Sequence, residues 1–381
     1  MKKLIQTIQN IWKIEDLKNR ILMTLAFIAI YRFGSFVVIP GVDPSQLAAL
    51  QAQSADGLLG LLNMFTGGAF SQASIFALGI MPYISASIVI QLLGMAIPYF
   101  QKLQREGESG RRKINNITRY LTIVITGGQA PGYIANLKNT LPESAFLLGE
   151  SAFWLSSIII LVTGTLFVMW LGEKITDGGV GNGISLLIMI GIIAVLPSSL
   201  SSEFAMALNA QSGGLVIFLV EMVILVVVIA LCILLVQGTR RIPVQYAKRV
   251  VGNKQYGGVR QFIPLKVNAA GVMPIIFAQA IMFVPVTLAG FSDDLTGIAS
   301  TLSDFTGFWY NFLFFILVVV FTYFYTAITV NPKQMAEDMK RNGGFIPGIK
   351  PGRKTAEYLD NIMSRITLPG SLYLGVIAIL P

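Results

Sequence analysis

Apolar residues in this chain gather in long runs, and charged residues lie almost entirely between the runs. A helix needs about 20 mostly apolar residues to cross ~30 Å of hydrocarbon. The pattern therefore indicates an all-α, polytopic membrane protein. It predicts nine membrane-spanning helices, at 21–39, 74–97, 120–137, 152–172, 184–200, 214–237, 269–291, 308–330 and 366–381.

Two of these runs are weaker than the others. The run at 120–137 is interrupted by Gly127, Gly128 and Pro131, and the run at 366–381 is short. No cleavable signal peptide is expected, because the first apolar run follows a long charged stretch and lacks a small-residue cleavage site.

The basic residues support all nine crossings, because they fall on one side only if every run crosses. Loops 40–73, 201–213 and 292–307 contain no Lys or Arg. Loops on the cytoplasmic side of membrane proteins are enriched in these residues. The distribution therefore predicts a cytoplasmic N-terminus. Of the 28 Lys and Arg residues, five lie in 1–20, six in 98–119, one in 173–183, and seven in each of 238–268 and 331–365.

Composition supports the membrane assignment and excludes several classes of protein. Charged residues make up 12% of the chain, against about 25% in soluble domains. Histidine is absent, which excludes His-based catalysis and nearly every zinc site. Cys232 is the single cysteine, so the chain has no internal disulfide, and its apolar surroundings are typical of a small buried hydrophobe.

The apolar runs carry almost no chemistry. Arg32 and Glu221 are nearly the only ionisable residues in them, and no P-loop is present. Ion-coupled transporters usually bind the coupling ion with carboxylates, His or Lys in their spans. No cofactor or enzymatic activity is expected. A passage with apolar walls is favoured, and a secondary transporter of a small solute with inverted repeats is the alternative.

The first outer loop contains a short apolar stretch, GLLGLLNMF at 57–65, followed by Thr66, Gly67 and Gly68. It is too short to cross a membrane, and the glycine pair predicts a helix end and a hinge. One interpretation is a movable element that enters a cavity between the helices. The other is a helix that lies on the outer membrane surface. The residues alone do not choose between them.

The loops at 238–268 and 331–365 are about 30 residues long and basic. Their charges could serve only to orient the protein, since flanking charges are enough for that purpose. Loops of this length and charge also suit docking to an anionic partner, such as ribosomal RNA or an acidic protein face.

Five segments together resemble the SecY family, the channel subunits of the general protein translocon. The resemblance runs in order along nearly the whole chain. The segments are NMFTGGAFSQASIFALGIMPYISASIVIQLL at 63–93, REGESGRRKI at 105–114, GEKITDGGVGNGIS at 172–185, PLKVNAAGVMPIIFA at 264–278 and YTAITVNPKQMAEDMKRNGGFIPGIKPGRKTAEYLD at 325–360.

The resemblance implies ten helices in two inverted halves around a central pore. The halves would be 1–200 and 201–381, with nine of the ten helices in this sequence and the tenth beyond Pro381. The implied function is a protein-conducting channel that translocates secretory proteins across the cytoplasmic membrane and inserts membrane proteins into it.

The resemblance also implies three sets of channel residues. A plug at about 57–72 would include Leu58, Leu59, Leu61, Leu62, Asn63, Met64, Phe65, Thr66, Gly67 and Gly68. A mid-membrane pore ring would consist of Ile80, Ile84, Ile184, Ile188 and Ile276. A lateral gate between the spans 74–97 and 269–291 would include Ser85, Gln91 and Val284.

The partners implied by the resemblance are SecE, SecG in many members, SecA, the translating ribosome, signal sequences and unfolded client chains. Docking of SecA or the ribosome would use Arg240, Arg241, Lys254, Lys350 and Arg353. Lys350 stands where an Arg is usual in the family, so it keeps the charge and loses the planar guanidinium fork. Asn253 and Lys254 stand where a double Arg is common, which lowers the charge of that loop.

Overall fold

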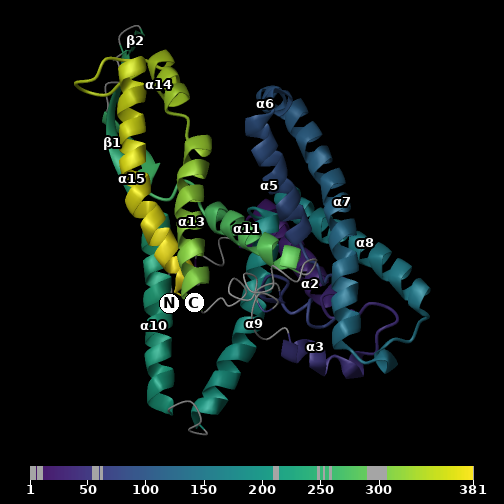
Figure 1. Cartoon of the computed structure of the whole chain (residues 1–381). Helices are drawn as coiled ribbons and strands as arrows, with labels where there is room; N and C mark the ends of the chain where they lie inside the picture. Colours follow the sequence, from purple (N-terminus) through teal and green to yellow (C-terminus); the bar gives the residue numbers. More distant parts are fainter. Residues whose placement is uncertain are drawn as a thin grey trace. The chain divides into compact units, whose positions relative to one another are not determined.

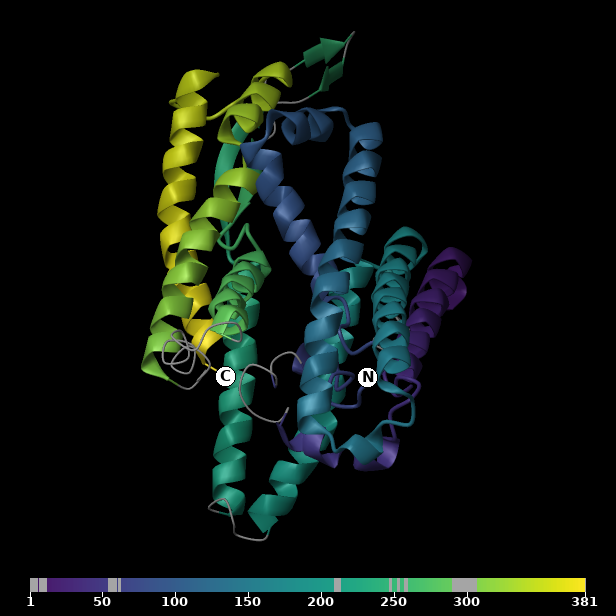
Figure 2. The same cartoon turned by 45° about the vertical axis from the view of Figure 1, so that its right-hand side comes forward.

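The computed structural model describes residues 6, 12–53, 60, 63–208, 214–246, 249–251, 254–256, 260–289 and 307–380. A helix forms in each of the nine apolar runs, as Figures 1 and 2 show. The helices are α2 (Glu15–Gly34), α3 (Ala48–Gln53), α5 (Met81–Ala96), α6 (Pro98–Arg105), α7 (Glu108–Thr140), α8 (Glu150–Gly178), α9 (Gly183–Leu208), α10 (Leu215–Gln237), α11 (Met273–Ala289), α13 (Phe308–Thr329), α14 (Pro332–Arg341) and α15 (Arg353–Ile379).

Five helical stretches of the described chain are long and apolar enough to cross a membrane: α8, α9, α10, α13 with α14, and α15. The bent pair of α5 and α6 would make a sixth. The other predicted spans contain α2, α7 and the 17-residue α11. Most residues of α10 are exposed, with Leu235 as its buried residue, as expected for a helix surrounded by lipid. The crossing of all nine runs stays a prediction.

The chain divides into two compact units, Met1–Ala205 and Met206–Pro381. In the first unit, α7 packs against both α5 and α8, and α2 packs against α8. In the second unit, α13 packs against both α11 and α15.

The predicted span at 74–97 is wrong at its start. The helix begins at Met81, and residues 66–80 form a series of turns. Gly67, Gly68 and Gly79 have φ values of 66°, 89° and 54°, and Ala73 has φ 46°. These left-handed conformations cannot continue an α-helix, whereas Pro82 suits the first turn of α5.

The two basic loops also differ from the prediction, because they contain strands and share one sheet. Strand β1 (Thr239–Tyr246) pairs on one side with β4 (Arg260–Lys266) and on the other with β5 (Gly344–Phe345), and all neighbours are antiparallel. A separate two-stranded sheet joins β2 (Arg249–Val251) and β3 (Lys254–Tyr256). The loops at 238–268 and 331–365 therefore form one folded body.

A hydrophobic core supports this sheet. Ile242 and Val244 of β1 are buried, while the residues between and before them are exposed, as expected for a strand with one covered face. They pack with Met339 of α14 and Leu359 of α15. The exposed basic residues of β1 are thus held on a rigid support.

Candidate functional site

Residues 63–80, here called the turn segment, begin with a short helical turn and lead into α5. Asn63, Met64 and Phe65 are helical, and the two glycines that follow end the turn. The Gly68 amide donates to the backbone oxygen of Asn63 at 2.9 Å, and the Gly67 amide donates to the backbone oxygen of Met64 at 3.1 Å. The predicted helix end at the glycine pair is confirmed.

Side-chain hydrogen bonds fix the turns that follow. The amide of Ser71 donates to Asn63 Oδ1 at 3.0 Å, and the amide of Phe70 donates to Thr66 Oγ1 at 3.2 Å. The Ser71 hydroxyl donates to the backbone oxygen of Gly68 at 3.0 Å. Short polar side chains therefore supply the hydrogen bonds that a helix would otherwise provide.

The turn segment pairs with the chain that follows α2. The Ile39 amide donates to the Ala73 oxygen at 2.8 Å, and the Ile75 amide donates to the Val37 oxygen at 2.9 Å. The hydroxyl of Tyr31 lies 3.4 Å from the backbone oxygen of Thr66. These contacts join the turn segment to the end of α2 and to the residues that follow it.

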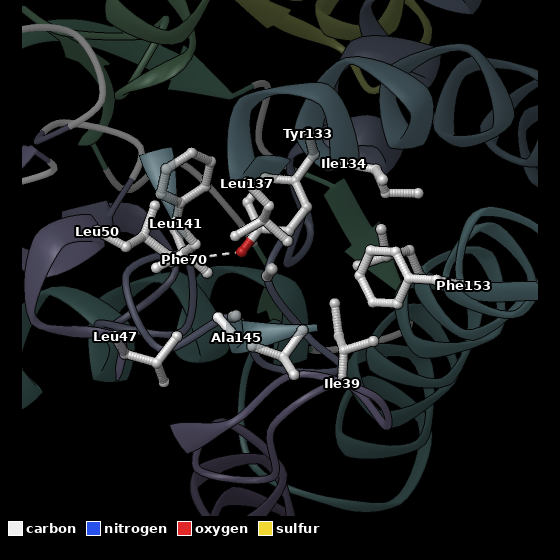
Figure 3. Packing of buried hydrophobic residues seen from close by; sticks show 14 of the residues in the cluster. Ile39, Leu47, Leu50, Phe70, Tyr133, Ile134, Leu137, Leu141, Ala145 and Phe153 are labelled. Atoms are coloured by element: carbon white, nitrogen blue, oxygen red, sulfur yellow. Dashed lines mark hydrogen bonds between the residues drawn. The ribbon is translucent and has the colours of Figure 1, made fainter. Parts of the chain in front are cut away.

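Helices α7 and α8 cover another side of the turn segment. Tyr133 of α7 donates from its hydroxyl to the Phe70 oxygen at 2.8 Å, drawn as a dashed line in Figure 3. Phe70 belongs to a buried cluster with Ile134 and Leu137 of α7 and Phe153 of α8. On α8, a Cβ at Gly164 would lie 2.1 Å from the Ile75 oxygen, so the two backbones touch.

Helix α9 meets the turn segment at Gly191. A Cβ on Gly191 would lie 2.8 Å from the Phe65 oxygen, and a Cβ on Gly67 would lie 2.9 Å from the Gly191 Cα. Backbone therefore packs on backbone, which larger residues would prevent. The turn segment is held by α2, α7, α8 and α9 together.

The predicted plug residues are only partly described. Leu58, Leu59, Leu61 and Leu62 lie outside the described residues. Thr66 and Gly67 are buried, whereas 45% of the Met64 surface is exposed. Asn63, Phe65 and Gly68 are half-buried.

The five predicted ring residues belong to three helices or their caps. Ile80 caps α5, and its oxygen accepts from the Ile84 amide at 3.1 Å. Both side chains are buried, and Ile184, Ile188 and Ile276 are half-buried. Their convergence on one constriction stays a prediction.

The predicted gate residues lie on α5 and α11. Ser85 and Gln91 are half-buried on α5, and Gln91 Nε2 lies 3.4 Å from the Ser87 hydroxyl. Val284 is part of α11, and its side chain lies outside the described part of the chain. The gate stays a prediction.

The predicted docking residues lie on the folded body of the basic loops. Arg240 and Arg241 are exposed on β1, and Lys350 and Arg353 are exposed before and at the start of α15. Arg353 Nε lies 3.0 Å from Glu357 Oε1, so its charge is partly compensated. Lys254 belongs to β3, and its side chain is not among those described.

Sequence reasoning missed the residues that hold the turn segment: Tyr31, Arg32, Tyr133, Gly164 and Gly191. Arg32 carried a signal, since a lone charge in an apolar run is unusual. The two glycines carried none, because their role depends on which backbone approaches them. Within the described residues, no group of three or more His, Cys, Asp or Glu could hold a metal ion.

Comparisons with known proteins agree with this geometry. The profile of the SecY family matches residues 74–381. The chain is 44% identical to the protein translocase subunit SecY of Streptomyces scabiei, over 97% of this chain and 87% of the relative. It is 42% identical to the subunit of the same name from Rickettsia conorii, over 96% and 86%.

Solved channel structures share the fold. A SecY structure reported with a plug domain that stabilises the closed channel has a TM-score of 0.63 and 18% identity, covering 95% of this chain and 85% of its own. The idle yeast Ssh1 complex bound to the yeast 80S ribosome has a TM-score of 0.65 and 15% identity, covering 95% and 84%.

The family match excludes the solute-transporter alternative, because it spans most of the chain and rests on close relatives with one name. Together with the helices of membrane length, it identifies a multi-pass subunit of a protein-conducting channel, not an enzyme. The chain belongs to the SecY family.

Proposed function

We propose that this chain forms the channel through which unfolded proteins cross the cytoplasmic membrane and from which membrane proteins enter the lipid. The N-terminus and the basic loops face the cytoplasm. The two halves, 1–200 and 201–381, are inverted copies that enclose the pore. The distribution of Lys and Arg supports this orientation, because it leaves the alternate loops without basic residues.

The plug at about 57–72 seals the resting channel. The observation that carries this assignment is the burial of an irregular segment, residues 66–80, among apolar helices. Irregular backbone at membrane depth is tolerated only where protein or water shields it. Contacts with α2, α7, α8 and α9 favour an element inserted between helices over a helix on the membrane surface.

The pore ring completes the seal. Branched aliphatic side chains offer no hydrogen bond to a passing chain, and a narrow apolar collar excludes water. Ile80 is the last residue of the turn segment and Ile84 lies in the first turn of α5, so the turn segment and part of the ring are continuous in the chain. Ile184, Ile188 and Ile276 supply the rest of the collar.

The lateral gate opens between α5 and α11 and admits signal sequences to lipid. Ser85, Gln91 and Val284 line it. The polar side chains on α5 are half-buried in an otherwise apolar helix, which suits a surface that alternates between protein and lipid contact.

The folded body of the basic loops docks SecA or the translating ribosome, and SecE, with SecG where present, completes the membrane complex. Arg240, Arg241, Lys254, Lys350 and Arg353 supply the charge. Lys or Arg side chains on a rigid support attract RNA phosphates and acidic protein faces. SecA or chain elongation supplies the driving force, since this chain carries no nucleotide-binding loop.

Deleting residues 58–65 tests the plug. The variant is compared with the unaltered protein in proteoliposomes that contain its partner subunits. We expect the variant to fold, to translocate clients and to conduct ions at rest. A resting conductance equal to that of the unaltered protein would favour the surface-helix interpretation.

A further inference from the structure

Arg32 is a charged residue in a predicted span, and its guanidinium contacts the turn segment. Its Nη1 donates to the backbone oxygen of Gly67 at 2.9 Å, and its guanidinium carbon lies 5.3 Å from the centre of the Phe36 ring. Arg32 is half-buried and has no carboxylate within 4.0 Å among the residues that the structure describes. The neutral backbone oxygen of Gly67 is therefore the acceptor that the guanidinium has in the described part of the chain.

That carbonyl lies where a helical turn ends. A backbone oxygen carries partial negative charge, and a hydrogen bond to it from a charged donor is stronger than one between neutral groups. Arg32 thus binds the turn segment at a point suited to a positive charge.

The contact depends on two glycines. A Cβ on Gly67 would lie 2.8 Å from Arg32 Nη1, and a Cβ on Gly191 would lie 2.8 Å from the Phe65 oxygen. The backbone of the turn segment therefore fits between the guanidinium of α2 and the backbone of α9. No side chain intervenes on either side.

We propose that Arg32 is a positioning residue that latches the turn segment in the closed channel. The inference rests on the sealing role proposed above. A charge at membrane depth is costly without a partner, and the Gly67 carbonyl is that partner in the resting position. Moving the segment away leaves the guanidinium without this acceptor until water or a client backbone replaces it. The resting position is favoured for this reason.

The test replaces Arg32 in the protein, which is reconstituted with its partner subunits. Arg32→Gln and Arg32→Met remove the charge, and Arg32→Lys keeps it without the planar fork. We expect the neutral variants to raise the resting ion conductance by about tenfold, the scale of one lost charged hydrogen bond. The lysine variant should restore most of the seal.

Arg20→Gln is the matched control. Arg20 lies on the same helix and pairs with Asp16 at 3.4 Å, with both side chains exposed. The resting conductance of the Arg20→Gln channel should equal that of the unaltered protein. A leak of equal size in Arg20→Gln and Arg32→Gln would mean that any charge loss on α2 suffices, and it would overturn the latch.

A second measurement follows the segment itself. In a Cys232→Ser background, a cysteine at Met64 reports how fast a membrane-impermeant maleimide reaches the segment from outside. We expect Arg32→Gln to change this rate, and Arg32→Lys to return it toward the original value. A rate that is the same in both variants and the parent would contradict a latch.

Gly191→Ala tests the same contact without altering charge. The added Cβ presses on the Phe65 oxygen, so this variant should also leak and change the labelling rate. It keeps the proposal testable if the Arg32 variants fail to fold. A sealed Gly191→Ala channel with an unchanged rate would count against the position assigned to the segment.

Combining Arg32→Gln with the deletion of 58–65 separates the two proposals. If the deletion alone does not leak, the plug proposal fails. If the deletion leaks and Arg32→Gln seals normally, only the latch fails. If the two changes add fully, Arg32 acts by a route other than the plug, which also overturns the latch.

Discussion

The hydroxyl of Tyr133 donates a hydrogen bond to the backbone oxygen of Phe70 at 2.8 Å, and the rings of the same two residues lie 4.9 Å apart, edge to face. The two residues are 63 positions apart in the chain. One tyrosine of α7 thus binds both the backbone and the side chain of the turn segment.

Tyr133→Phe removes the hydrogen bond and keeps the ring contact. The Phe70 oxygen also accepts from the Ala73 amide at 3.3 Å, so it is not left without a donor. We expect a loss of about 1 kcal/mol in the free energy of unfolding, the net value of a single hydrogen bond. Thermal unfolding in detergent measures it. Tyr120→Phe, at a position 69% exposed on the same helix, should change nothing.

Gly164→Ala should destabilise the first unit, because the new Cβ would lie 2.1 Å from the Ile75 backbone oxygen. To relieve this clash, the backbone of α8 or of the turn segment would have to move. We expect a loss of about 1–3 kcal/mol, the usual range for overpacking. Denaturation in detergent is the measurement. Gly132→Ala on α7 has open space at its Cβ, so it should be neutral or stabilising. Equal losses at both sites would refute the contact.

The pore ring predicts a graded response to substitution. Replacing Ile80, Ile84, Ile184, Ile188 and Ile276 together with Ser should raise ion leak and relax the selection of signal sequences, because polar side chains hold water. Replacement with Val or Leu should do little. Conductance and export of a reporter with a defective signal measure the two effects. If the Leu variants leaked as much as the Ser variants, the leak would come from disturbed packing and not from water held by polar side chains.

The basic surface predicts a salt-dependent loss of partner binding. Reversing the charge of Arg240 and Arg241, or of Lys350 and Arg353, should weaken the binding of SecA or ribosomes without unfolding the helices. The difference from the unaltered protein should shrink at high salt, because exposed charges are screened within about 10 Å at 0.1 M. Lys138→Glu, predicted on the opposite side, is the control. Unchanged affinity at low salt would leave these charges with an orienting role alone.

The orientation predicts opposite labelling of two cysteines in a Cys232→Ser background. A cysteine at Ala210 should react with an impermeant maleimide from outside, and one at Gln255 should react only from inside, because the loops differ in basic residues. Labelling of both from one side would refute the arrangement of nine crossings.

Hydrophobic runs were enough to predict a helix in each of the nine apolar stretches, and the motifs were enough to predict the family. The start of α5 could not be predicted, because the apolar residues at 74–80 continue the pattern of the helix that follows them. Ala73 and Gly79 have positive φ values, which the hydrophobic pattern does not reveal. Ile242 and Val244 alternate with Arg241, Pro243 and Gln245, and this period of two was a readable strand signal in a chain dominated by long apolar runs. Short β5 carried no such signal.

The candidate site was predictable only in part for a similar reason. Motifs identify residues by type, so Gly67 and Gly68 were found, and the helix end they predict is present. The partners of the segment come from distant helices, and Gly164 and Gly191 look like any other glycine in an apolar run. Arg32 stood out by its charge, yet its acceptor is a backbone atom, which no sequence pattern reveals.

The pairing of β1 with β5 has a consequence for how these loops can change length. Gln245 lies opposite Phe345 and Tyr246 opposite Gly344, and a Cβ on Gly344 would lie 2.9 Å from the Tyr246 ring. A one-residue insertion in either strand would turn its side chains to the opposite face and break this fit. Insertions and deletions within β1 or β5 should therefore be rejected, because they would shift this pairing. Chimeras between relatives should exchange both loops together.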